Sequence, residues 1–213
     1  MAEKISLNNC EDFSAALASR TPVPGGGGAA ALAGALGTAL CCMAGRLTSG
    51  KKKFADVEDD LQRMIASAEE LRLRFLGLID EDAIAFEPLS RAYSLPKDTE
   101  NYAGIMRKAT LDAAAAPLEM MRCSCRAIEL LEEMAAKCSK LMISDVGCGA
   151  SLAGAALECA SMNVFVNTKL LRGDPEADAM DREAREMLEN YIPRAQKVSA
   201  YVIELLTGGS IYG

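Results

Sequence analysis

The sequence predicts an all-α fold, a single-domain bundle of five to six long, partly kinked helices spanning residues 1–213, with residues 208–213 as a loose tail. Composition is the first reason: half of the 213 residues are hydrophobic, yet only 5% are aromatic and none is Trp. Ala, Leu and Met, which favour helices, supply much of the apolar content, while β-branched residues are sparse. The second reason is that no run alternates β-branched or aromatic residues with polar ones, so no strand is predicted.

Two helices are predicted before residue 50. The Asn pair at positions 8–9 can cap a short helix that ends near Ser19. Residues 21–24, Thr-Pro-Val-Pro, cannot be helical because each proline pushes the preceding residue to extended geometry. Four consecutive glycines then lead into a second helix that runs to about Thr48.

Four further helices follow, and prolines and caps mark most of their ends. We expect them at about residues 56–93, 98–137, 144–171 and 174–207. Prolines at positions 88, 117 and 193 fall inside three of them and should kink the chain. Ser144 is expected to be the N-cap of the fifth helix, and Asp174-Pro175-Glu176 is a strong start for the sixth.

The second and fifth predicted helices both carry small residues four positions apart. These are Ala30, Gly34, Thr38 and Cys42 in the second, and Gly147, Ser151, Ala155 and Cys159 in the fifth. Small side chains let helix backbones approach closely. The rows favour tight packing inside one subunit or a homodimer formed through these helices, and both can hold together.

Charge and residue inventory exclude several classes of function. With 30 acidic and 23 basic residues the net charge is −7, which disfavours binding to nucleic acid. The absence of His removes the commonest general base and zinc ligand. The eight Cys form no C-x-x-C pair, which indicates reduced thiols in a cytoplasmic protein and no metal site. Residues 21–45 carry no charge, but their Gly, Pro and Ala content favours a buried helix over a membrane span.

Two segments have the chemistry of an anion site. Pro24-Gly25-Gly26-Gly27-Gly28 exposes backbone N–H groups at a helix N-terminus, where the helix dipole also favours an anion. The alternative is a flexible connector, but a connector gains nothing from the rigid prolines before it. Lys51-Lys52-Lys53, with Arg46 nearby, is the densest basic cluster of the chain, either a solvated helix end or a site that captures a polycarboxylate.

Two further motifs combine polar and apolar residues on one helix face. Asp82 ends the acidic run 80–82 and lies one turn before Phe86. If Phe86 points inward, burial raises the pKa of Asp82 and suits it to proton transfer, whereas the alternative is a solvated acidic face. Asn163 and Asn167 share a face among apolar neighbours, and their amides either satisfy local partners or hold a ligand with amide-like edges.

Taken in order, these motifs resemble the formiminotetrahydrofolate cyclodeaminase and methenyltetrahydrofolate cyclohydrolase family. The resemblance covers about residues 10–170. The matching pieces are Pro24-Gly25-Gly26-Gly27, Gly50-Lys51-Lys52-Lys53-Phe54, Asp80-Glu81-Asp82 through Ala85-Phe86, Leu95-Pro96-Lys97, Ser144-Asp145 with Gly147, and Asn163 with Asn167. Gly28 departs from the family, which commonly has Ser there. The resemblance implies an all-helical homodimer with a folate site lined by these segments.

The two reactions of that family act on the same carbon. The cyclohydrolase adds water to the methenyl bridge of tetrahydrofolate, and the cyclodeaminase closes a formimino group into that bridge and releases ammonia. Both need proton transfer at a tetrahedral carbon and no cofactor beyond the tetrahydrofolate substrate. The resemblance implies that Asp82 is the general acid–base. It assigns the following residues to the substrate: Pro24, Gly25, Gly26, Gly27, Gly28, Lys51, Lys52, Ser144, Asp145, Asn163 and Asn167.

The choice between the two reactions leans toward the cyclohydrolase, because this sequence is not fused to a formimino-transferring domain. The glycine loop and the lysines are expected to take the substrate's glutamate tail, in a monoglutamyl or polyglutamylated folate. A non-catalytic helical dimerisation or adaptor module is the alternative of another class. It would explain the small-residue helices but not the ordered set of glycine, lysine, aspartate and asparagine motifs.

Overall fold

The computed structural model describes residues 4–209 and confirms the all-α class. Across this range the chain forms six α-helices and no strand. The helices are α1 (Cys10–Leu17), α2 (Gly26–Thr48), α3 (Glu58–Tyr93), α4 (Tyr102–Lys137), α5 (Ile143–Thr168) and α6 (Pro175–Thr207). Short 3-10 helices lie at Ile5–Leu7, Lys52–Val57, Lys140–Met142 and Lys169–Leu171. Most of the predicted tail, 208–213, lies outside the described residues.

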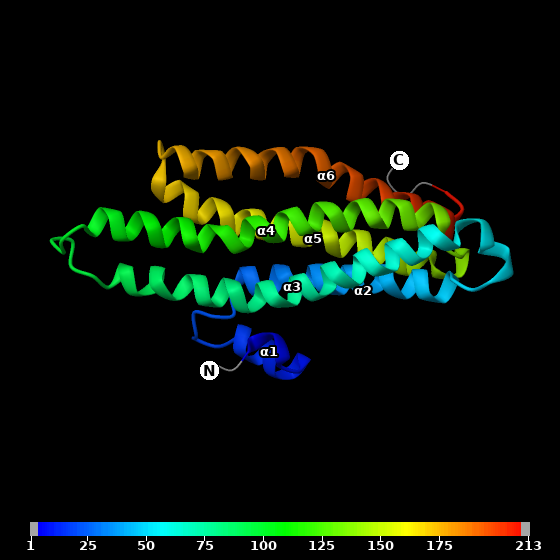
Figure 1. Ribbon diagram of the computed structural model, residues 1–213, viewed down its shortest axis with the longest axis horizontal. Coiled ribbons are helices and arrows are strands. Elements are labelled where there is room, and N and C mark those ends of the chain that lie inside the picture. Colours follow the sequence, from blue (N-terminus) through cyan, green and yellow to red (C-terminus); the bar gives the residue numbers. More distant parts are fainter. Residues whose placement is uncertain (1–3, 210–213) are drawn as a thin grey trace.

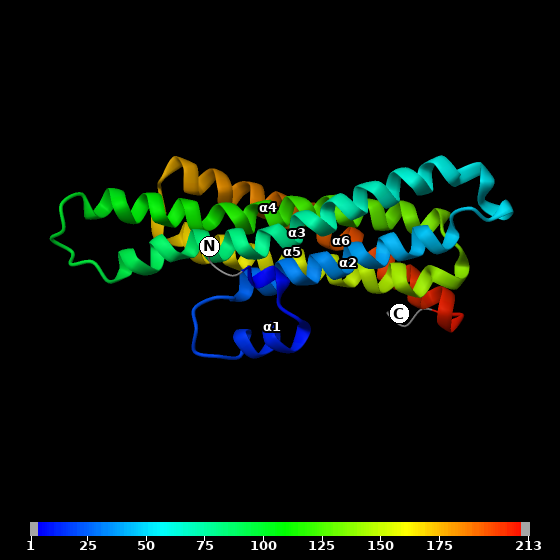
Figure 2. The ribbon, with the colours of Figure 1, turned by 60° about the horizontal axis from the view of Figure 1, so that its bottom comes forward.

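The long helices α2 to α6 lie side by side in one elongated bundle, and the short α1 lies outside it (Figures 1 and 2). Helix α5 packs against α2, α4 and α6, while α3 packs against α2 and α4. Phe75 and Leu78 of α3 and Met120 of α4 are among the largest fully buried side chains. The core therefore lies between these five helices, and α1 adds only Phe13 as a buried side chain.

Helices α2 and α5 run antiparallel with their backbones in near contact. A Cβ built on Gly37 would lie 2.9 Å from the carbonyl oxygen of Gly149. At the end of α2, the backbone N–H of Ser139 donates to Thr48 Oγ1 at 2.9 Å. Small residues at the crossing therefore serve packing inside the subunit, as one of the two interpretations of the sequence expected.

The two rows of small residues differ in how far they are buried. All four members of the α2 row are buried, and Gly34 lies against the Phe75 ring. In the α5 row Gly147 is buried against Val202, but Ser151, Ala155 and Cys159 are exposed. The α2 row is therefore used inside the subunit, while three positions of the α5 row remain open. The homodimer stays a prediction.

Most helix ends agree with their predicted caps. The Asn9 side chain accepts a hydrogen bond from the first turn of α1, and Asp174 does the same for α6. The cap predicted at Ser144 is wrong, because Ser144 is the second residue of α5 and its N-cap is Met142. A 3-10 turn, Lys140–Met142, runs directly into α5, and Ser139 caps that turn instead.

The other boundaries shift by a few residues. The 3-10 helix Lys52–Val57 occupies the predicted start of α3, which begins at Glu58. Asn101 has a left-handed φ of 55° and delays the start of α4 to Tyr102. Each of α3, α4 and α6 continues through its internal proline.

Two segments are long and apolar enough to cross a membrane by length and composition alone, α2 and Lys140–Leu171. In the bundle, 61% and 50% of their most apolar windows are buried. Much of this apolar surface therefore forms the protein core, but part of α5 remains open to solvent.

Candidate active site

A cleft with a volume of about 190 Å³ opens where the start of α2 meets α3, α4 and α5. It brings together residues that are far apart in the sequence. The lining consists of Pro22, Val23, Gly25, Gly26, Gly27, Asp82, Phe86, Ala113, Pro117, Asn163, Val166 and Asn167. Six of the predicted site residues, including Asp82 and both asparagines, therefore meet in one cavity.

Asp82 lies directly over the first turn of α2. A Cβ built on Gly27 would lie 2.5 Å from both carboxyl oxygens of Asp82, so only glycine leaves room for this carboxyl. Burial raises the pKa of Asp82 to about 6. Among the described residues, no hydrogen bond to this carboxyl offsets the loss of water. The prediction that Asp82 sits half-buried near Phe86 is confirmed, and the carboxyl can exchange a proton near neutral pH.

The glycine loop presents unpaired backbone donors beside this carboxyl. The first hydrogen bond of α2 runs from the Ala29 N–H to the Gly25 carbonyl oxygen at 3.0 Å. The three N–H groups before it, at Gly26, Gly27 and Gly28, precede the intrahelical pattern and are free for a ligand. The positive end of the helix dipole lies at the same point, so the site can stabilise negative charge.

In both asparagines the side-chain nitrogen donates hydrogen bonds, while the side-chain oxygen has no donor among the described residues. The Asn163 side-chain nitrogen donates to the Cys159 carbonyl oxygen at 2.8 Å. The Asn167 nitrogen donates to the Asn163 carbonyl oxygen at 2.9 Å and to that of Ala113 at 3.4 Å. Within the described chain neither amide oxygen accepts a hydrogen bond. Both oxygens can therefore accept from N–H groups of a ligand.

Two loop residues assigned to the substrate lie beneath the cleft instead of in its wall. Pro24 is buried, and a Cβ on Gly28 would lie 3.1 Å from the Pro24 Cβ and 3.9 Å from the Phe13 ring. These two residues shape the loop through packing. A larger residue than glycine at position 28 would have to displace Pro24.

The other four predicted residues lie at the opposite end of the bundle. Lys51 and Lys52 follow the C-terminus of α2, and Ser144 and Asp145 lie in the first turn of α5. Helix α2 has 23 residues, which separates its two ends by about 35 Å. Within one subunit these residues do not reach the cleft.

The apolar wall of the cleft carried no clear signal in the sequence. Val23, Ala113 and Val166 have the same character as core residues of a helical bundle, and only position in space distinguishes them. Phe86 is the exception, because its helical spacing from Asp82 singles it out, whereas Pro117 is interpreted only as a kink. Within residues 4–209, no group of three or more Cys, Asp or Glu side chains is arranged to hold a metal ion.

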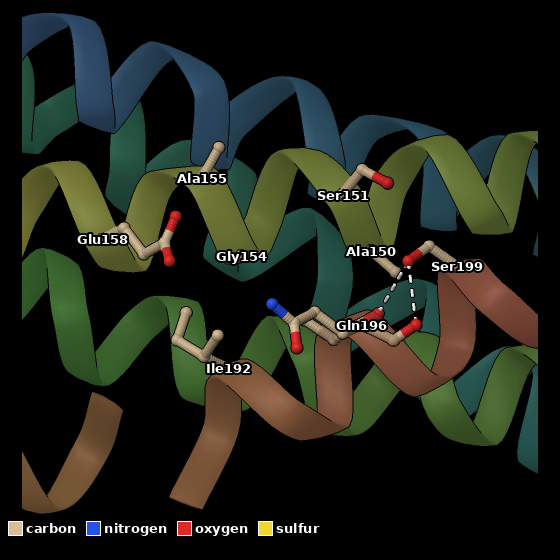
Figure 3. Close-up of a pocket in the computed structure, with 9 residues that line it drawn as sticks. Ala150, Ser151, Gly154, Ala155, Glu158, Ile192, Gln196 and Ser199 are labelled. Carbon is tan, nitrogen blue, oxygen red and sulfur yellow. Dashed lines mark hydrogen bonds between the residues drawn. The ribbon is translucent and has the colours of Figure 1, made fainter. Parts of the chain in front are cut away.

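A second cleft, of about 210 Å³, lies between α5 and α6 (Figure 3). Its lining includes Ser151, Ala155 and Glu158 from α5 and Gln196 and Ser199 from α6. None of the residues in the ordered motifs lines this cleft. The first cleft, with Asp82, is therefore the candidate active site.

Comparison with known proteins agrees with this choice. The family model described as Formiminotransferase-cyclodeaminase matches residues 9–186. The chain belongs to this family. A family relative named methenyltetrahydrofolate cyclohydrolase, from Methylorubrum extorquens, is 42% identical over 176 residues, which cover 81% of this chain and 84% of that protein.

Other members of the family are more distant. Formimidoyltransferase-cyclodeaminase from Sus scrofa is 28% identical over 194 residues, which cover 88% of this chain but only 35% of that protein. The crystal structure of formiminotetrahydrofolate cyclodeaminase from Thermotoga maritima superposes with a TM-score of 0.83 at 28% identity. The match covers 93% of this chain and 99% of the Thermotoga maritima chain. The predicted family and the predicted all-α fold are both confirmed.

Proposed function

We propose that the protein is a 5,10-methenyltetrahydrofolate cyclohydrolase, which adds water to the methenyl bridge and yields 10-formyltetrahydrofolate. The observation that carries this proposal is the Asp82 carboxyl, desolvated over Gly27 and with its pKa raised to about 6. The cyclohydrolase relative at 42% identity, matched over most of its length, supports the same reaction.

The proposed chemistry uses Asp82 first as a base and then as an acid. Water loses a proton to the Asp82 carboxylate as its oxygen bonds to the bridge carbon. Collapse of the tetrahedral intermediate breaks the bond from that carbon to N5 of the folate. Asp82 returns its proton to N5, and the hydroxyl proton leaves to solvent as the formyl group forms on N10. The free N–H groups at the start of α2 lie beside Asp82 and can bind the oxygen that gains charge.

Substrate binding uses both the polar and the apolar side chains that line the cleft. The open amide oxygens of Asn163 and Asn167 accept from N–H groups on the folate ring edge. Phe86, Pro117 and Val166 provide the apolar surface against which a flat ring packs. Lys51 and Lys52, which do not reach the cleft of their own subunit, take the carboxylates of the glutamate tail from the partner subunit of the proposed homodimer.

The second candidate is a 5-formiminotetrahydrofolate cyclodeaminase. The structural similarity to the Thermotoga maritima enzyme favours it, as do relatives named formimidoyltransferase-cyclodeaminase. This chain spans about a third of the length of those relatives. The same site would serve, with Asp82 donating the proton to the departing ammonia.

We further infer that the protein is a cytoplasmic homodimer that acts on monoglutamyl or polyglutamylated folate without another cofactor. All eight cysteines are free thiols, which supports a reducing compartment. The exposed small residues of α5 support a contact between two subunits.

The decisive experiment follows the near-ultraviolet absorbance of 5,10-methenyltetrahydrofolate with purified protein. Enzyme-dependent loss of the band, absent in the Asp82→Asn variant, establishes the cyclohydrolase. If the band is stable, the 5-formimino compound is supplied, and the appearance of the same band establishes the cyclodeaminase. No change in either assay, together with no folate binding, overturns the enzyme and leaves the adaptor module.

A further inference from the structure

Pro117 interrupts the backbone hydrogen bonds of α4 where this helix forms a wall of the cleft. A proline has no N–H group, so it cannot donate to the carbonyl oxygen four residues earlier, and its ring crowds that carbonyl. In α4 the carbonyl belongs to Ala113, which lines the same cleft. Ala113 is only 5% exposed, so little water reaches it. A buried carbonyl of this kind needs another donor.

Asn167 of α5 supplies a donor to this carbonyl. Its side-chain nitrogen donates to the Ala113 carbonyl oxygen at 3.4 Å, across the contact between the two helices. The same nitrogen donates to the Asn163 carbonyl oxygen at 2.9 Å, one turn back along α5. A side-chain amide nitrogen carries two protons, and these two acceptors use both of them. The nitrogen of Asn167 therefore has no proton left for a ligand.

The two acceptors also fix the orientation of the Asn167 amide. If its nitrogen and oxygen exchanged places, the oxygen would face two carbonyl oxygens, and neither of them can donate a hydrogen bond. The amide oxygen is therefore the polar atom that Asn167 offers to a ligand in the cleft, which this residue lines. Asn163 lacks a contact of this kind, because its side-chain nitrogen donates within α5, to the Cys159 carbonyl oxygen.

The contact between Asn167 and Ala113 depends on where the Ala113 carbonyl points. N–H···O hydrogen bonds in proteins usually measure about 2.7–3.2 Å, so a bond at 3.4 Å would be lost after a small movement. An ordinary residue at position 117 would donate its own N–H to this carbonyl and hold it along the axis of α4. Pro117 removes that donor and leaves the carbonyl available to α5.

We propose that Pro117 is a positioning residue of the active site. By leaving the Ala113 carbonyl without its helical donor, it holds the Asn167 amide with the oxygen free for the ligand. This part of the cleft then offers the ligand an acceptor and no donor. That the ligand is a folate, with N–H groups on its ring edge, rests on the proposed function.

The other two prolines inside helices have no such partner. Pro88 and Pro193 remove the helical donors of the Ile84 and Glu189 carbonyls. In the described part of the chain, no side chain of another helix donates to either carbonyl. Both residues are exposed, so water can serve them. Pro193 is also outside the cleft, which makes Pro193→Ala the matched control for Pro117→Ala.

The first test compares KM with kcat. Pro117→Ala restores the N–H at position 117 and should release the Asn167 amide. KM for 5,10-methenyltetrahydrofolate should then rise about fivefold, as for the loss of one ordinary hydrogen bond, while kcat changes less than about twofold. Pro117→Ser restores the same N–H and should act alike, whereas Pro193→Ala should leave KM unchanged. A wild-type KM in both Pro117 variants overturns the proposal.

Pro117 also lines the cleft, so a double-variant cycle must separate the contact of its ring from its effect through Asn167. Asn167→Ala removes the amide and should raise KM at least as much as Pro117→Ala does. If Pro117 acts through the amide, P117A/N167A should have a KM within about twofold of that of N167A alone. A further rise by the full factor of the single variant would assign the effect to the ring and overturn the proposal.

The Asn167 amide can also be observed in the free protein. In ¹⁵N NMR spectra its side-chain protons are assigned by their absence from N167A. These protons should exchange with water about tenfold more slowly in the wild type than in P117A, because one of their two acceptors is lost in the variant. P193A should match the wild type. Equal exchange rates in the wild type and P117A overturn the proposal.

Failure of the proposed function is distinguishable from failure of this inference. A wild-type protein that is inactive on both folates removes the KM comparison, but the exchange rates of the amide protons still decide whether Pro117 positions Asn167. An active wild type whose amide protons exchange equally fast with and without Pro117 keeps the proposed function and overturns only the role of Pro117.

Discussion

At the scale of the residue, Asp82 combines a pKa of about 6 with a position that is possible only because residue 27 is glycine. Its carboxyl occupies the space that a side chain at Gly27 would need, and it is desolvated there without a compensating partner in the described chain. An acid that gives and takes a proton near pH 6 is suited to a reaction that needs both steps.

The pH dependence of the cyclohydrolase reaction should follow this carboxyl. As a base, Asp82 is active when ionised, so kcat/KM should rise as the pH passes about 6 and then level off. Asp82→Asn should lower kcat by about 100-fold or more and remove the rise. The uncatalysed hydrolysis rate is subtracted at each pH. An unchanged profile in the variant would assign the base to another group.

The same carboxyl should make the native protein less stable at neutral pH. Its pKa is about 6 when folded and about 3.8 when unfolded, so the penalty is complete above pH 6 and vanishes below pH 4. Asp82→Asn should raise the free energy of unfolding at pH 7 by roughly 2 kcal/mol, reduced by any remaining contact of the carboxyl with water. Urea unfolding at pH 7 and pH 4 measures this. A gain of equal size at both values would indicate packing and not ionisation.

Lys51 and Lys52 should act on the substrate tail and not on the chemistry. The variant K51A/K52A removes two positive charges, so KM should rise several-fold more for a polyglutamylated folate than for the monoglutamate, with kcat nearly unchanged. Lys197→Ala, an exposed lysine on α6, is the matched control and should leave both KM values as they are. An equal rise for both substrates would contradict the assignment to the tail.

The polar residues of the cleft and Phe86 could be predicted from sequence, whereas most of its apolar wall could not. Asp82 and Phe86 lie one helical turn apart, and so do Asn163 and Asn167, so helical spacing alone puts each pair on one face. Val23, Ala113 and Val166 have no such signature, because apolar residues of a cleft and of a core satisfy the same pattern. Tertiary packing decides which of them reach the cleft.

At the scale of the element, the close approach of α2 and α5 depends on glycine at the crossing. Gly37→Ala would place a methyl group 2.9 Å from the Gly149 carbonyl oxygen, and a backbone atom cannot move away cheaply. We expect a loss of about 1–3 kcal/mol in the free energy of unfolding.

Gly77→Ala in α3 is the matched control, because its Cβ would meet only the Glu81 side chain at 3.8 Å. Alanine is the better helix former, so this variant should be unchanged or more stable by up to about 1 kcal/mol. Denaturation curves of the two variants decide the point. Equal losses in both would show that helix propensity, not the crossing, governs position 37.

The elements themselves could be predicted from short-range signals. Asn9 and Asp174 cap their helices as their side chains indicate, since capping is local chemistry. Ser144 has the same signature and fails as a cap, because the 3-10 turn before α5 already continues the backbone. The assignment of all 213 residues to one domain stays a prediction.

At the scale of the whole molecule, the exposed small residues of α5 should control assembly of the proposed homodimer. Ala155→Glu places a charge among Ser151, Ala155 and Cys159, where the subunit alone tolerates it because the position is exposed. Burying that charge in the dimer should weaken self-association at least about 100-fold, and turnover should fall with it. Lys197→Glu is the control for added negative charge. A variant that sediments as a dimer would place the interface elsewhere.

The bundle also sets a gradient of backbone protection around the cleft. Helix α2 is enclosed by α3 and α5, so its amide hydrogens should be among the slowest to exchange with solvent. Helix α1 buries only Phe13, so its amide hydrogens should exchange early, although Ser6 in the segment before it donates two hydrogen bonds to Asp80 of α3. Pro22 and Val23 connect the fast-exchanging α1 to the slow-exchanging α2 and line one rim of the cleft. This rim should therefore open more often than the first turn of α2 beneath Asp82.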